Sequence, residues 1–193
     1  MQVSINSEIG RLEGVIIHTP GSEVENMTPE NAERALYSDI LNLSIASVEY
    51  AQFAGVLKKF TRVFEIKKML TDLLEKRKLK ISLLKNICQH EGIPGMENKL
   101  AEFSPAQLST LLIEGMILER NNLTNYLSKE KYSLRPLHNL FFTRDSAMGM
   151  NESMIIGRMA NRVRERETII IEAILKHSGL FETNILNPAK PEK

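Results

Sequence analysis

The sequence predicts an α/β fold in which two short mixed strand-and-helix units flank an inserted helical domain. Two observations support this class. Apolar, β-branched runs that are typical of buried strands occur near both ends of the chain. Between them, from Lys67 to about Lys131, the sequence is rich in Leu, Lys, Glu and Asn and shows no strand-like alternation. We therefore expect a first unit over residues 1–66, a helical insertion over 67–132 and a second unit over 133–193.

The first unit contains two predicted strands and two predicted helices. Gly14–Thr19 is a β-branched run that is stopped by Pro20, which predicts a strand followed by a turn. Thr28–Leu36 begins with a threonine and a proline, the pattern of a helix N-cap, and predicts a short helix. Ser44–Lys59 has apolar residues at helical spacing, and Thr61–Ile66 alternates like a strand.

The middle of the chain predicts three or four helices. Gly92–Gly95 contains two glycines and a proline, which end a helix. Ser104 and Pro105 then form an N-cap with proline at the first helical position, so another helix is expected to begin there. This block is interpreted as an insertion because strand signals resume after it.

The second unit predicts a strand at Leu140–Thr143 and another at Ser153–Gly157. Asn161–His177 predicts a long helix with one apolar side, and Gly179 is placed to terminate it. Phe181–Leu186 predicts the start of a further strand. The two units therefore have a similar order of elements, although they share no obvious sequence identity.

Composition and charge exclude several classes of function. The 193 residues carry 25 basic and 24 acidic side chains, and a net charge of +1 does not favour nucleic acid or an anionic membrane as a partner. Met1–Ile5 has no basic region followed by an apolar stretch, so we expect no secretory signal, and no apolar run is long enough to span a bilayer. We therefore expect a cytoplasmic protein. One cysteine excludes an internal disulfide and a zinc site with several thiolates.

The strongest candidate for a chemical role is Asp145. It follows directly on the predicted strand, where a partly desolvated carboxylate could bind a planar cation through two parallel hydrogen bonds. The alternative is that Asp145 pairs with Arg144 or caps a turn. Asn139, six residues earlier, could receive a substrate carboxylate, although an asparagine beside a proline-containing turn is often structural.

Other polar residues have plain structural interpretations. The arginines at 158, 162, 164 and 166 could form a solvated helix face that pairs with Glu165 and Glu167. Asp39 could be a second site acid or an N-cap. The four histidines show no metal-ligand spacing, and Cys88 lies in the helical block, where a buried structural thiol is expected.

Several segments taken in order resemble the arginine deiminase family. The specific ones are the Asn-x-x-Phe-Thr-Arg-Asp pattern of residues 139–145 and the Arg-x-x-Glu-Thr pattern of residues 164–168. The opening residues 7–12, the strand that ends at Pro20-Gly21 and the Thr-Pro-Glu-Asn string of residues 28–31 agree with it. The resemblance runs over essentially the whole chain and corresponds to the N-terminal half of the family.

The resemblance implies a fold and an activity. The family has the pentein-type α/β propeller, with five ββαβ units around a pore and a helical domain inserted after the first. This chain would then be a partial α/β propeller. Family members hydrolyse L-arginine to L-citrulline and ammonia without a cofactor. A cysteine thiolate attacks the guanidinium carbon, a histidine moves the protons and two acids hold the cation.

The resemblance also implies roles for residues of this chain. Asp145 corresponds to the first guanidinium-binding acid. Asn139 and Arg164 correspond to groups that hold the α-carboxylate of the substrate, and Phe142 corresponds to a residue that lines the pocket. Leu41 lies in a segment that resembles the mobile loop that closes over the substrate.

The chain also departs from the family pattern. The catalytic cysteine, the histidine and the second acid lie in the second half of the family, and Cys88 matches none of them. Ser38 replaces the first of two paired acids in the loop, and His138 replaces a proline.

Three hypotheses follow. The chain is a truncated arginine deiminase half, inactive alone, that binds arginine. Alternatively, it is a non-catalytic guanidino-binding or scaffolding subunit that pairs with a separate C-terminal-half chain or with itself. Thirdly, it is a related dimethylarginine- or agmatine-hydrolysing enzyme, which the helical insertion argues against.

Overall fold

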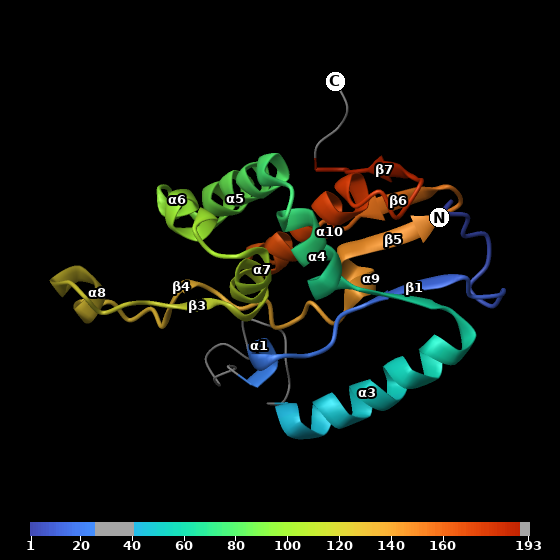
Figure 1. Cartoon of the computed structure of the whole chain (residues 1–193), viewed down its shortest axis with the longest axis horizontal. Helices are drawn as coiled ribbons and strands as arrows, with labels where there is room; N and C mark the ends of the chain where they lie inside the picture. The colour runs from blue at the N-terminus through green and yellow to red at the C-terminus, as the bar shows by residue number, and fades with distance from the viewer. Residues whose placement is uncertain (26–40, 190–193) are drawn as a thin grey trace.

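Three small β-sheets and a central group of helices make up the chain in the computed structural model, which describes residues 1–25 and 41–189 (Figure 1). The strands are β1 (Gly14–Ile17), β2 (Arg62–Glu65), β3 (Met116–Ile117), β4 (Tyr132–Leu134), β5 (Ala147–Met150), β6 (Ser153–Ile156) and β7 (Asn184–Leu186). The helices are α1 (Ser22–Glu25), α3 (Leu43–Phe60), α4 (Ile66–Leu74), α5 (Arg77–Glu91), α6 (Met96–Ala101), α7 (Pro105–Glu114), α8 (Leu123–Leu127), α9 (Thr143–Ser146) and α10 (Glu165–His177), with a 3₁₀ turn, η1, at Arg162–Arg164. The α/β class is confirmed.

The first sheet consists of β1 and β2, which run parallel with Val15 opposite Val63. Both predicted strands are confirmed, and so is the long helix between them. That helix, α3, begins at its N-cap residue Asn42, whose side-chain oxygen accepts hydrogen bonds from the backbone of Ser44 and Ile45. The helix expected over residues 28–36 lies outside the described residues.

The helical block begins directly after β2. Its capping signals are confirmed: Gly92 ends α5 in the left-handed conformation, and Ser104 forms a reciprocal capping box with Gln107 at the start of α7. The expectation of helix alone is wrong at β3, which pairs antiparallel with β4. Gly115 causes this change, because its φ of 88° turns the chain and a Cβ there would lie 2.9 Å from the carbonyl oxygen of Leu134.

The third sheet has the order β5-β6-β7 and lies beside α10 (Figure 1). β5 and β6 form a hairpin around Asn151, which adopts a positive φ of 52°, and β7 adds parallel to β6. The strand at Ser153–Gly157 and the helix at Asn161–His177 are confirmed, apart from the 3₁₀ turn at the start of that helix. A strand is also present within Phe181–Leu186, as β7.

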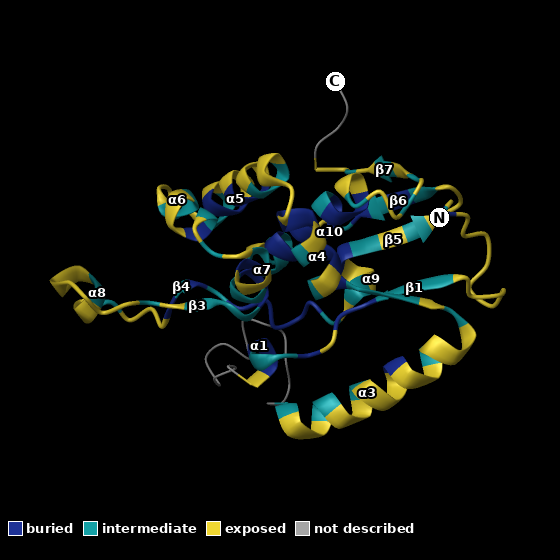
Figure 2. Cartoon of the chain, viewed as in Figure 1, coloured by how far each residue is buried: buried dark blue, intermediate teal, exposed yellow. Residues whose placement is uncertain are grey.

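One hydrophobic cluster joins all three segments of the chain. Val3, Leu70 and Ile174 are members, and α10 packs against both α4 and α5 of the helical block. Figure 2 shows that buried residues concentrate in α4, α7 and α10, whereas α3 is mostly exposed. The boundaries 1–66, 67–132 and 133–193 stay a prediction. Within the described ranges, no helix is long and apolar enough to cross a membrane.

Candidate functional site

Asp145 lies in α9, a single helical turn that leads into β5. The strand expected at Leu140–Thr143 is therefore wrong, since the strand of this region begins after Asp145 and not before it. Two successive turns stand in place of the strand. The backbone N–H of Phe142 donates to the backbone oxygen of Asn139 at 3.0 Å, and the backbone N–H of Asp145 donates to the backbone oxygen of Phe142 at 3.2 Å. The burial of these residues explains why the predicted strand is absent. Leu140 is fully buried while Phe142 is half exposed, so the run does not fit a strand covered on both faces.

Two contacts fix the turn that carries Asp145. The hydroxyl of Thr143 donates to the backbone oxygen of Ile16 in β1 at 3.1 Å. The backbone N–H of Gly157, directly after β6, donates to the backbone oxygen of Ser146 at 3.0 Å. The position of Asp145 is therefore set by the first sheet and by the third sheet together.

Arg164 provides the cation that Asp145 contacts. Its Nη1 atom lies 2.9 Å from Oδ2 of Asp145. The same guanidinium contacts both carboxylate oxygens of Glu167, with Nε 3.2 Å from Oε1 and Nη2 3.0 Å from Oε2. Arg164 and Glu167 are three residues apart at the start of α10, so their side chains lie on one side of it. A planar guanidinium is thus held between two carboxylates.

Burial differs strongly across this cluster. Asp145 is 48% exposed, Arg164 is 13% exposed and Glu167 is 1% exposed. Burial raises the pKa of the Glu167 carboxyl, although the hydrogen bonds from Arg164 oppose the shift. Burial would lower the pKa of Arg164, but Glu167 and Asp145 outweigh it and raise that pKa. Glu167 therefore fixes Arg164 from the protein side, while Asp145 presents its carboxylate toward solvent.

The other predicted site residues are placed differently. Phe142 belongs to the same turn as Asp145 and packs its ring against Phe141, with 4.3 Å between ring centroids. Asn139 is buried one turn earlier. Leu41 is half-buried beside the N-cap of α3. The substrate-binding roles of these residues stay predictions, and Ser38 and Asp39 lie outside the described residues.

Arg144 pairs with Glu8 and not with Asp145, so the expectation of an Arg144–Asp145 pair is wrong. The Arg144 guanidinium contacts both carboxylate oxygens of Glu8, and both side chains are largely exposed. The arginine run was interpreted as a solvated face that pairs with Glu165 and Glu167. The pairing is correct for Arg164 and Glu167, but Glu167 is buried and Arg164 is only 13% exposed, so these two residues are not a solvated face. Arg166 is also buried and contacts Glu91. Arg158, in contrast, is exposed.

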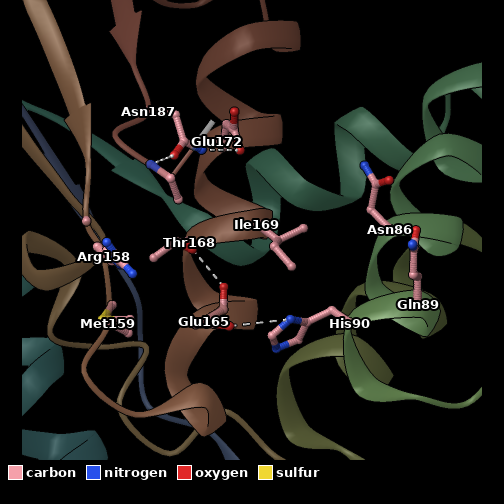
Figure 3. Close-up of a pocket in the computed structure, with 12 residues that line it drawn as sticks. Asn86, Gln89, His90, Arg158, Met159, Glu165, Thr168, Ile169, Glu172 and Asn187 are labelled. Atoms are coloured by element: carbon pink, nitrogen blue, oxygen red, sulfur yellow. Dashed lines mark hydrogen bonds and ion pairs between the residues drawn. The ribbon is translucent and has the colours of Figure 1, made fainter. Parts of the chain in front are cut away.

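A cavity of about 310 Å³ lies between α5, the loop after β6 and α10 (Figure 3). His90 and Glu165 approach to 3.6 Å at one edge of it. Figure 3 shows Arg158 across the cavity from Gln89. Asp145 is not among the residues that line this cavity, so the cavity and the acid are separate features. We base the candidate site on the Asp145 cluster, where the charged groups converge.

Cys88 is unsuited to nucleophilic chemistry. It is fully buried in α5 as part of the hydrophobic cluster. Burial, with smaller contributions from Glu97 and Glu91, raises the pKa of its thiol to about 11. A thiol is nucleophilic as the thiolate, which such a pKa disfavours near neutral pH. The expectation of a buried structural thiol is confirmed.

A second buried polar cluster surrounds His18 at the end of β1. Its Nε2 atom lies 3.0 Å from Glu23, and its Nδ1 atom lies 3.4 Å from Glu65. Burial lowers the pKa of His18, but the two carboxylates outweigh burial and raise it above its ordinary value. For Glu65, burial raises the pKa, and hydrogen bonds from His18, Lys68 and Thr19 outweigh it and lower the pKa. The cluster joins β1 to β2 and α1.

We expect the stability that Glu65 provides through His18 to depend on pH. The raised pKa of His18 means that its contribution is complete below its ordinary pKa of 6.5 and is lost as pH rises through the folded value. The lowered pKa of Glu65 means that its contribution is present above its ordinary 4.5 and is lost as pH falls through the folded value. Urea unfolding of the wild type and of Glu65→Gln should therefore differ most between these two pH values. A difference that is constant with pH would contradict the pairing.

Two residues of the site were not identified from the sequence as ligands or supports. Glu167 was expected only as a partner of the arginines on a solvated helix face, and not as a buried carboxylate that supports the site. The three-residue spacing to Arg164 was the signal that indicates such a pair on a helix. Glu23 gave no signal, since its burial depends on His18 and on the turn at Gly21, whose N–H donates to it at 2.7 Å.

Comparison with known proteins identifies the family. The arginine deiminase family profile matches residues 33–187, which include Asp145, Arg164 and Glu167. The chain belongs to the arginine deiminase family. The resemblance stated from the motifs is thereby confirmed.

Curated relatives agree in name and in coverage. The chain is 31% identical over 193 residues to arginine deiminase 1 of Staphylococcus epidermidis and 34% identical over 192 residues to the arginine deiminase of Listeria monocytogenes. It is 32% identical over 199 residues to the arginine deiminase of Borrelia recurrentis. The matches cover 93–95% of this chain and 47–48% of the relatives. The chain spans about half the length of the curated relatives it matches.

Proposed function

We propose that this chain provides the arginine-binding half of an arginine deiminase site, with Asp145 as the acid that binds the substrate guanidinium. The observation that carries the proposal is the 2.9 Å contact between Asp145 and Arg164. Asp145 already holds a guanidinium group, and its half-exposed position allows a second such group to approach from solvent.

Substrate binding then becomes an exchange of partners. The guanidinium of L-arginine binds the carboxylate of Asp145 in place of Arg164. Arg164 is thereby released from Asp145 and binds the α-carboxylate of the substrate. Glu167 remains bound to Arg164 throughout, because its two contacts come from the buried side. Phe142, beside Asp145 in the same turn, would cover the apolar part of the substrate, and Asn139 would assist with the α-carboxylate.

The complete reaction needs a nucleophile that Cys88 does not provide. In the hydrolysis of L-arginine to L-citrulline, a thiolate adds to the guanidinium carbon and ammonia leaves with a proton from a general acid. Water then adds to the same carbon and expels the thiolate, which yields citrulline. The buried Cys88 has a raised pKa and lies in the helical block, away from this turn. We infer that the chain alone binds arginine without turnover.

The propeller architecture is part of the same proposal. The β1-β2 sheet and the β5-β6-β7 sheet would be two units of a pentein-type propeller, with α4–α7 as the inserted helical domain. Its support is the family membership and the convergence of both sheets on the Asp145 turn, through Thr143 and Gly157. The second candidate function is a non-catalytic guanidino-binding subunit. The burial of Cys88, the one cysteine among the described residues, favours it.

Calorimetric titration with L-arginine tests the proposal. Wild-type chain is expected to bind arginine, and Asp145→Asn is expected to lose about 1.5–3 kcal/mol of binding free energy, the usual contribution of a charged hydrogen bond. Asp72→Asn, which makes the same change at an exposed position of α4, should bind like the wild type. L-citrulline, which has no positive guanidinium, should bind weakly.

Two outcomes would contradict the proposal. Equal binding by wild type and Asp145→Asn would remove Asp145 from the site. Robust citrulline production by the purified chain would show that it contains a nucleophile after all.

A further inference from the structure

The start of α10 is held from two sides. On one side, Arg164 contacts Asp145 and Glu167 of the candidate site. On the other side lies the end of α5, which belongs to the helical block. Figure 3 shows His90 of α5 facing Glu165 of α10. The first turn of this helix therefore stands between the candidate site and the helical block.

Arg166 makes a buried contact with the helical block. Its Nη1 atom lies 3.0 Å from Oε1 of Glu91, and the two side chains are 1% and 17% exposed. Its Nη2 atom donates to the backbone oxygen of Arg135. Burial lowers the pKa of the Arg166 guanidinium, and the carboxylate of Glu91 provides the largest opposing contribution. Because a buried cation is costly to separate from its carboxylate, residue 166 is fixed relative to α5.

Two further contacts join the same region to α5. The Nη2 atom of Arg162 donates to the backbone oxygen of His90 at 2.7 Å. The Nδ1 atom of His90 lies 3.6 Å from Oε2 of Glu165. The contacts with α5 thus come from positions on both sides of residue 164 in the sequence. The backbone at Arg164 is therefore fixed by α5 from before and from after.

The turn that carries Asp145 has a different support. The hydroxyl of Thr143 binds the backbone oxygen of Ile16 in the first sheet, and the N–H of Gly157 binds the backbone oxygen of Ser146 beside the third sheet. The two groups that meet in the candidate site are thus positioned by different parts of the chain. The sheets position the acid, and α5 positions the start of the helix that carries the arginine.

We propose that Glu91 is a positioning residue for substrate recognition. Through Arg166 it holds the first turn of α10 in the place from which Arg164 reaches the α-carboxylate of L-arginine. This inference rests on the proposed roles of Asp145 and Arg164. A binding group must be held within about 0.5 Å of its productive geometry, so a small shift of this turn is enough to weaken the contact with the carboxylate. The helical block thereby contributes to the selection of an amino acid over an amine with the same guanidinium.

Titration calorimetry with two ligands tests this role. L-arginine carries a guanidinium and an α-carboxylate, whereas agmatine carries the guanidinium without the carboxylate, so the wild type should prefer L-arginine. Glu91→Gln should weaken the binding of L-arginine about tenfold, which the loss of one charged hydrogen bond accounts for. The binding of agmatine should be unchanged, because agmatine depends on Asp145 and not on the position of Arg164.

Two features of the design separate mispositioning from a loss of stability. Glu102→Gln makes the same change at an exposed position directly after α6, and it should bind both ligands like the wild type. Partial unfolding of Glu91→Gln would weaken both apparent affinities by the same factor, so the ratio of the two affinities does not depend on the folded fraction.

A double-mutant cycle tests whether Glu91 acts through Arg164. In the background of Arg164→Gln, Glu91→Gln should cause no further loss of L-arginine affinity, because the group that it positions is already absent. Additive losses would overturn the inference. An unchanged ratio of the two affinities in Glu91→Gln would overturn the inference alone and leave the proposed function standing. A wild type that binds neither ligand, or that binds both equally, would contradict the proposed roles of Asp145 or Arg164, and the inference with them.

Discussion

Replacement of Arg166 by alanine is expected to lower the free energy of unfolding by about 3–5 kcal/mol, the usual cost of breaking a buried ion pair from one side. Arg166 is 1% exposed, and its Nη1 atom lies 3.0 Å from Oε1 of Glu91. Its Nη2 atom also donates to the backbone oxygen of Arg135. The side chain therefore joins α10 to the end of α5 and to the segment after β4, and its removal leaves a carboxylate and a carbonyl without their donor.

Chemical denaturation monitored by circular dichroism measures this effect. Arg166→Met keeps most of the buried volume and separates the loss of charge pairing from the loss of packing. Arg144→Ala is the surface control: its pair with Glu8 is largely exposed on both sides, so its removal should leave the free energy of unfolding nearly unchanged. Equal stability of Arg166→Ala and Arg144→Ala would show that the buried pair contributes little.

Replacement of Gly157 by alanine should damage both stability and the Asp145 turn. A Cβ atom at residue 157 would lie 2.1 Å from the backbone oxygen of Asp145, and backbone cannot move aside as a side-chain end can. We expect the hydrogen bond from Gly157 to Ser146 to break, at a cost of about 1–3 kcal/mol, which is typical of overpacking. The displaced turn should also weaken arginine binding.

Gly149→Ala is the matched control for this substitution. Its Cβ would meet the terminal methyl carbon of Ile5 at 2.0 Å, which is as close as the contact at Gly157. Ile5 is 42% exposed, however, so its side chain has room to rotate away. Thermal unfolding should therefore place Gly149→Ala well above Gly157→Ala. The reverse order would mean that the Asp145 turn is less rigid than its contacts indicate.

The helices were the part of the fold that local sequence determines. α7 followed from the capping signal at Ser104, and α3 and α10 followed from apolar spacing, since both signals act within a few residues. The strand expected at Leu140–Thr143 failed because a short apolar run has no periodicity of its own. Its conformation depends on distant groups, such as the backbone oxygen of Ile16 that binds Thr143.

The site was predictable in its residues but not in its geometry. The motif containing Asp145 and the pattern containing Arg164 indicated the family, and the family profile confirmed that membership. The contact between these two side chains joins positions 19 residues apart, and no local pattern reports it. The burial of Glu167 and the close approach of Gly157 to the Asp145 turn likewise arise only when the third sheet packs beside α10.

The inaccessible thiol of Cys88 has a practical consequence for spectroscopy. Because the only cysteine of the sequence is fully buried and has a thiol pKa of about 11, alkylating reagents should spare it in the folded chain. A cysteine introduced at a solvent-exposed position would then be the single reactive group. Fluorophores or spin labels could thus be attached one at a time to follow motion of the chain, without first removing a native sulfur from its core.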